Sequence, residues 1–89
     1  LNKAVQALRK TVYLDREFIL AHYNLGQIYQ QQGQNRQAER AFKNARRLLK
    51  QKMAHEPVPE SDGLAAGRLL QLVDMALAGE GAGHATPIG

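Results

Sequence analysis

The stretch that decides the fold is AHYNLGQIYQQQGQNRQAERAFKNA, residues 21–45. Measured at about 3.6 residues per turn, it places apolar and small side chains on one face of two successive helices. Between them, Gly33 can adopt a positive φ just past a helix end, and Asn35 is suited to cap the next helix. The stretch therefore predicts a helical hairpin whose facing residues are Ala21, Leu25, Ile28, Tyr29 and Gln32 in the first helix, and Ala38, Ala41, Phe42, Ala45 and Leu49 in the second.

Around this hairpin the sequence predicts an all-α chain of about four helices. Residues 1–18 contain an amphipathic helix, and residues 19–53 form the hairpin, whose second helix runs from Arg36 to Lys52. Pro57 and Pro59 make residues 54–61 a linker, because proline cannot continue a helix. Residues 62–78 form a fourth helix capped by Ser61 or Asp62, and the glycine-rich residues 79–89 form a disordered tail.

Length and composition argue against an enzyme. The chain has 89 residues, no cysteine and three scattered histidines, which excludes a disulfide framework and predicts no metal site. Its eight acidic residues are spread over turns and helix ends, and no glycine-rich phosphate loop or nucleophile beside a histidine is present. We therefore expect a non-catalytic chain with no cofactor of its own.

The charge of the chain is divided unevenly. The net charge is +4, but residues 1–54 contain eleven Lys and Arg against three acids, whereas residues 55–89 contain Arg68 against five acids. We expect the two parts to attract each other. No apolar run reaches the roughly 20 residues that span a bilayer. The chain starts at Leu1 within a helical pattern, so we expect it to be part of a longer protein.

The hairpin resembles the tetratricopeptide repeat (TPR), a two-helix unit of about 34 residues. The resemblance is carried by Ala21, Leu25, Gly26, Tyr29, Gly33, Ala38, Phe42 and Ala45. Stepping back one repeat aligns Ala4 with Ala38 and Leu8 with Phe42, so residues 1–18 resemble the second helix of a truncated preceding repeat. Two positions depart from the family. His22 replaces a large aromatic residue. Lys50 replaces the closing proline, and the absence of that proline suggests that the third helix continues.

The TPR resemblance implies that one face of the first hairpin helix lines a concave groove for a peptide or helix. That face carries Leu20, Tyr23, Asn24, Gln27, Gln30 and Gln31. The alternative is an ordinary polar face, or one covered by the fourth helix. A second candidate surface is the basic stripe, formed by Arg36, Arg40, Lys43, Arg47 and Lys50. It can attract an acidic protein, lipid headgroups or nucleic acid, but charge runs on helices are usually only solvated.

Three other positions have a structural interpretation. Gly26 is expected to permit close helix approach, Gly67 to permit another close contact, and His22 to be a partly buried packing residue. The broad apolar face of the fourth helix suits it to cap the repeats, which otherwise leave apolar surface uncovered. We expect it to fold back as a cap within a monomer, with a swapped dimer as the alternative.

A narrower resemblance covers roughly residues 4–78. Residues 13–26, 42–49 and above all PESDGLAAGRL, residues 59–69, are similar to the C-terminal TPR region of bacterial chemoreceptor glutamate methyltransferases. In that family a separate methyltransferase domain uses S-adenosylmethionine. The resemblance implies a cytoplasmic interaction module in a chemotaxis-like signalling pathway. Its partner would be a chemoreceptor cytoplasmic region or the parent methyltransferase domain. The alternatives are a generic TPR adaptor and, less favoured, a basic helical nucleic-acid-binding module, for which stacking aromatics are missing among the basic residues.

Overall fold

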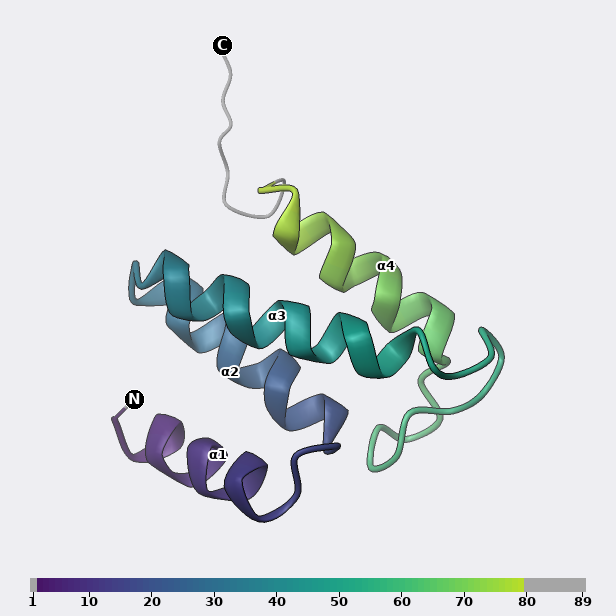
Figure 1. Cartoon of the computed structure of the whole chain (residues 1–89), viewed down its shortest axis with the longest axis horizontal. Coiled ribbons are helices and arrows are strands. Elements are labelled where there is room, and N and C mark those ends of the chain that lie inside the picture. The colour runs from purple at the N-terminus through teal and green to yellow at the C-terminus, as the bar shows by residue number, and fades with distance from the viewer. Residues whose placement is uncertain (1, 80–89) are drawn as a thin grey trace, which may run out of the picture.

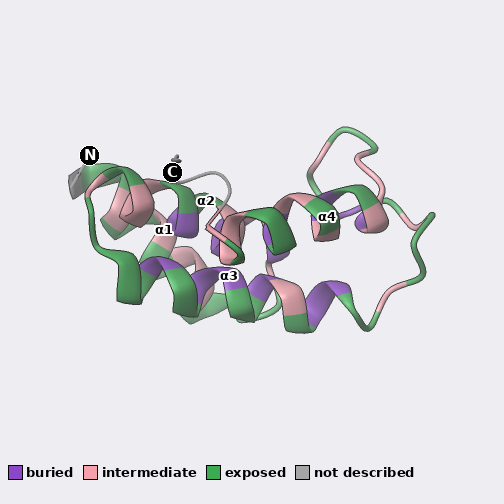
Figure 2. Cartoon of the chain, turned by 90° about the horizontal axis from the view of Figure 1, so that it is seen from above, coloured by how far each residue is buried: buried purple, intermediate pink, exposed green. Residues whose placement is uncertain are grey.

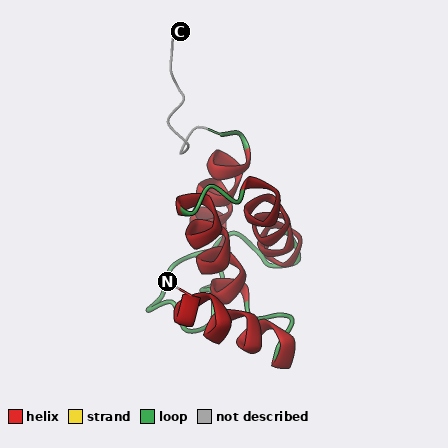
Figure 3. Ribbon diagram, turned by 90° about the vertical axis from the view of Figure 1, so that its left-hand side faces the viewer, coloured by secondary structure: helices red, strands yellow, loops and turns green. Residues whose placement is uncertain are grey.

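The computed structural model describes residues 2–79, which fold into four helices. These are α1 (Asn2–Leu14), α2 (Ile19–Gln31), α3 (Asn35–Leu49) and α4 (Ala66–Leu77). Each helix packs beside the one before it, so α1 and α4 lie at opposite edges (Figure 1). The rest of the described chain is loop and turn (Figure 3). The all-α prediction is confirmed, whereas residues 80–89 of the predicted tail lie outside the described residues.

The turn between α2 and α3 forms because Gly33 adopts a φ of 76°. The N–H of Gln34 donates to the carbonyl of Tyr29 at 2.8 Å, and the N–H of Gly33 donates to the carbonyl of Gln30 at 3.1 Å. This pair of bonds satisfies carbonyls that the end of α2 would otherwise leave free. The predicted cap by Asn35 is wrong, because Asn35 is the first residue of α3 and no side chain caps that helix.

The contact between α2 and α3 depends on Gly26. A Cβ atom at this position would lie 2.5 Å from Cε1 of Phe42, which is closer than real atoms approach. Because Gly26 carries only a hydrogen atom in place of a side chain, the Phe42 ring fills that space. Phe42 is almost fully buried. The prediction that Gly26 permits close helix approach is confirmed.

The core lies between the hairpin and α4. Each turn of α3 contains buried residues on one side and exposed residues on the other, as expected for a helix with one apolar face (Figure 2). The cluster of buried apolar side chains takes residues from α2, α3, α4 and the loop before α4. Its members are Ile19, Ala38, Phe42, Ala45, Leu48, Leu49, Val58, Ala66, Leu69 and Val73.

α1 is the least covered helix. None of residues 3–14 is buried, and Tyr13 and Leu14 are 79% and 73% exposed. Val5, Leu8 and Val12 of the predicted apolar stripe are half-buried. The connection to α2 is held by His22, which is buried and whose Nε2 lies 2.8 Å from the carbonyl oxygen of Arg16. Because a carbonyl only accepts, the Nε2–H of His22 donates this bond. The expected packing role of His22 is confirmed.

The segment between α3 and α4 is folded tightly onto the core. α3 ends at Leu49, so the predicted continuation to Lys52 is wrong. Within the segment predicted as a linker, Val58 is buried in the core cluster, and its N–H donates to the carbonyl of Leu64 at 2.8 Å. The prolines on either side of Val58 are exposed. The segment is therefore part of the core as well as a connection.

α4 begins at Ala66, four residues later than predicted, because the preceding residues form a turn. Glu60, Asp62 and Gly63 all have positive φ, which no helix contains. The Ser61 hydroxyl bonds the carbonyl of Val58 and accepts the N–H of Leu64, so the predicted cap by Ser61 or Asp62 is wrong. Instead, loop carbonyls satisfy the first N–H groups of α4.

Two such bonds join the loop to α4. The N–H of Ala66 donates to the carbonyl of Glu56 at 2.7 Å, and the N–H of Gly67 donates to the carbonyl of Ala54 at 2.9 Å. A Cβ on Gly67 would lie 3.0 Å from the Cβ of Ala54 and 3.2 Å from its carbonyl oxygen. The prediction that Gly67 permits a close contact is confirmed.

α4 packs on α3 of its own chain through apolar side chains. Leu69 and Val73 are almost completely buried. The Nε–H of Arg46 also donates to Oδ1 of Asp74 at 2.8 Å, so one ion pair joins the basic and acidic parts of the chain. Both side chains are about half exposed, and such a pair contributes at most about 1 kcal/mol. Burial of Leu69 and Val73 is therefore the main stabilising contribution to this contact.

We predict that Leu69→Ala lowers the free energy of unfolding by about 2–5 kcal/mol, because it removes buried methyl groups and leaves a cavity. Urea denaturation followed by circular dichroism measures the change. The matched control is Met75→Ala on the same helix, since Met75 is 49% exposed and should matter far less. Equal losses in both variants would contradict the packing of α4 described above.

We predict that Gly26→Ala destabilises the chain by about 1–3 kcal/mol, because the added methyl group collides with the Phe42 ring. Helix propensity alone predicts the opposite change, a gain in the free energy of unfolding of up to about 1 kcal/mol, because alanine favours a helix more than glycine does. Thermal denaturation decides between the two. Gln31→Ala, at an exposed position on the same helix, is the control and should change stability by less than about 0.5 kcal/mol.

Candidate functional site

The predicted groove residues all lie on α2 and are divided between packing and exposure. Asn24, Gln27 and Gln31 are exposed. Leu20, Tyr23 and Gln30 are half-buried, and Leu20 and Tyr23 pack against the core cluster. Ala21 and Leu25, from the opposite side of α2, are buried. α2 therefore presents a row of amide side chains beside a partly buried aromatic one.

Tyr23 is the fixed point of this face. Its ring packs against Phe42, with ring centroids 5.9 Å apart and planes inclined by 56°. Its hydroxyl oxygen accepts a hydrogen bond from Nε2 of Gln27 at 3.2 Å, one turn along α2. The Tyr23 hydroxyl hydrogen and the Gln27 amide oxygen remain able to bond a ligand. Packing and hydrogen bonding thus hold a donor and an acceptor side by side on the surface.

The C-terminal end of α4 flanks one end of this face. An open cavity of about 300 Å³ lies there, and Gln30, Phe42 and Leu77 are among the residues that line it. The alternative that the fourth helix covers the whole face does not apply, because Asn24, Gln27 and Gln31 stay exposed. Whether the face binds a partner remains a prediction.

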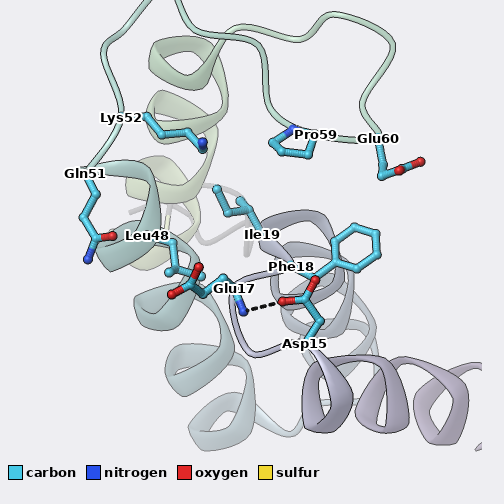
Figure 4. A pocket seen from close by; sticks show the side chains of 9 residues that line it. All are labelled: Asp15, Glu17, Phe18, Ile19, Leu48, Gln51, Lys52, Pro59 and Glu60. Carbon is cyan, nitrogen blue, oxygen red and sulfur yellow. Dashed lines mark hydrogen bonds between the residues drawn. The ribbon is translucent and has the colours of Figure 1, made fainter.

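A larger open cavity, of about 420 Å³, lies where the loop after α3 meets the start of α2 (Figure 4). Phe18, Ile19, Leu48 and Pro59 contribute its apolar side chains. Its polar side chains are Asp15, Glu17, Gln51, Lys52 and Glu60, and a carboxylate oxygen of Asp15 accepts the N–H of Glu17 at 3.1 Å. Sequence reasoning missed this cavity, because it joins residues 15–19 to residues 48–60 through a loop that was interpreted as a linker.

The charged side chains around the cavity of Figure 4 are three carboxylates and one ammonium group. Within residues 2–79, no three His, Cys, Asp or Glu side chains are arranged to hold a metal ion. Three carboxylates against the one ammonium of Lys52 also disfavour an anionic ligand. In the same part of the chain, no helix is long and apolar enough to cross a membrane.

The five residues of the basic stripe are all exposed; four lie on α3, and Lys50 follows its last residue. Nζ of Lys43 lies 3.1 Å from a carboxylate oxygen of Glu39, one turn away, with both side chains more than half exposed. Such a surface pair contributes little to stability. Arg40 differs from the other four residues because it lines a cavity between α1 and the hairpin. The stripe as a binding surface stays a prediction.

Comparison with known proteins supports the repeat interpretation. A family model described as a TPR repeat matches residues 1–33. The match covers α1, the following turn and α2, and it ends at Gly33. No curated protein and no solved structure matches the chain. The match and the four packed helices support a TPR-like fold, and TPR repeats generally bind protein partners. No comparison links the chain to a methyltransferase.

Proposed function

We propose that the chain is a protein–protein interaction module that holds a segment of its partner against the exposed face of α2. The observation that carries this proposal is the Tyr23–Gln27 pair, in which ring packing and a 3.2 Å hydrogen bond fix two polar groups on the surface. Side chains that are already ordered lose less conformational entropy when a partner binds. The pair is therefore suited to recognition.

The chemistry of the face favours a peptide ligand. Asn24, Gln27 and Gln31 each offer an amide donor and an amide acceptor, and none carries a charge. Such groups can bond the N–H and C=O groups of a peptide backbone without requiring charged side chains in the ligand. The half-buried ring of Tyr23 adds amphipathic contact area beside them.

We further propose that this module belongs to a chemoreceptor glutamate methyltransferase and brings that enzyme close to a receptor. The support is the resemblance of residues 13–26, 42–49 and 59–69 to the TPR region of that family. Methyl transfer from S-adenosylmethionine would belong to a separate domain, and none of it is assigned to this chain. Under this proposal the partner is a chemoreceptor cytoplasmic segment and the location is the cytoplasm.

A titration with a chemoreceptor cytoplasmic fragment tests the proposal. We predict that Tyr23→Phe and Gln27→Ala each weaken binding by about threefold to tenfold, the loss expected for one hydrogen bond. Tyr23→Phe keeps the ring that packs on Phe42, so the fold is retained. Tyr13→Phe and Gln71→Ala are the matched controls, because both remove the same groups from exposed positions on other helices.

The outcomes separate the two parts of the proposal. Equal affinity of the wild-type chain and both α2 variants would exclude the α2 face as the binding site. No binding of the receptor fragment by the wild-type chain would exclude the receptor as partner. A parallel titration with the isolated methyltransferase domain then tests whether the α2 face contacts the enzyme itself.

A further inference from the structure

A groove runs between α1 and the α2–α3 hairpin. It consists of two adjoining open cavities of about 400 Å³ and 310 Å³, which share Arg9, Tyr29 and Gln37. From Val5 to Val12, the groove follows α1 over seven residue steps, or roughly 10 Å at 1.5 Å per step. An extended peptide covers that length with about three or four residues.

The charged side chains of this groove are of one sign. Arg9 of α1 and Arg40 of α3 are the charged residues among those that line it, and both are exposed. Neither forms an ion pair within residues 2–79, where Lys43–Glu39 and Arg46–Asp74 are the two pairs present. Two guanidinium groups are thus available to a ligand, with no carboxylate in the groove to compete.

The remaining residues of the groove suit a peptide. Val12 and Leu25 provide apolar surface between α1, which carries Arg9, and α3, which carries Arg40. Amide side chains follow the groove along its length and can bond an extended backbone. They are Gln6, Gln32, Gln34, Gln37 and Asn44. Tyr29 is half-buried and His22 is buried, so the aromatic rings of the groove do not form the exposed stacking row of a single-stranded nucleic-acid channel.

We propose that this groove binds an extended acidic segment of a partner protein, whose carboxylates bond Arg9 and Arg40 while its backbone bonds the amides. The groove lies between α1, α2 and α3 and shares no residue with the face that carries Tyr23 and Gln27. It is therefore a second surface, and it does not depend on the function proposed for the α2 face.

The test uses the full 89-residue chain and a fluorescein-labelled eight-residue peptide of alternating glutamate and alanine, measured by fluorescence anisotropy at low salt. We predict that the double variant Arg9→Gln/Arg40→Gln raises the Kd about tenfold or more, because each arginine forms a charge-assisted hydrogen bond. The control Lys10→Gln/Arg47→Gln removes the same charge from exposed positions on α1 and α3, outside the groove, and should change the Kd less than about twofold.

Several outcomes would overturn the proposal. These are equal weakening by the two double variants, no binding of the acidic peptide to the wild-type chain, and equal binding of a peptide with glutamine in place of glutamate. A single-stranded DNA of the same charge that binds as tightly and responds to the same variants would assign the groove to nucleic acid instead. Tyr23→Phe should bind the acidic peptide normally, so failure of this groove and failure of the α2 face are distinguishable.

Discussion

The contact between Phe42 and Gly26 is the constraint on which the rest of this structure depends. The ring occupies the space that any side chain at Gly26 would fill, which sets how closely α2 and α3 approach. The same ring supports Tyr23 on the exposed face of α2 and lines the cavity beside the C-terminal end of α4. One buried aromatic residue therefore connects the hairpin, the candidate binding face and the last helix.

The second constraint is the closure of α4 onto the hairpin. Isolated repeats leave an apolar face uncovered, and here Leu69 and Val73 cover it from the same chain. The loop before α4 contributes to this closure in two ways, since Val58 enters the core and the carbonyls of Ala54 and Glu56 accept the first N–H groups of the helix. The start of α4 is thus fixed by tertiary hydrogen bonds.

The two proposed surfaces use different chemistry. On α2, neighbouring side chains one turn apart form a neutral pair, so the surface is a property of a single helix resting on the core. The groove beside α1 requires three helices, because Arg9 and Arg40 are 31 positions apart in sequence and come together only when α1 packs against the hairpin. A partner would match both surfaces if one of its segments presents backbone N–H and C=O groups to α2 and another, acidic segment enters the groove.

The sequence by itself determined the helix class, the hairpin, the turn at Gly33 and the close approach at Gly26, because helical periodicity and the conformational freedom of glycine are local properties. Of the six residues that it assigned to the outer face of α2, Asn24, Gln27 and Gln31 are exposed and the other three are half-buried. Tertiary structure alone decided where α4 begins, because distant carbonyls replace the cap that Ser61 was expected to provide. It also decided which basic residues line a groove, since periodicity places Arg40 among the four other cations of the basic stripe and only packing brings Arg9 to it. The periodicity of one helix shows which residues share a face, but it does not show which other helix packs against that face.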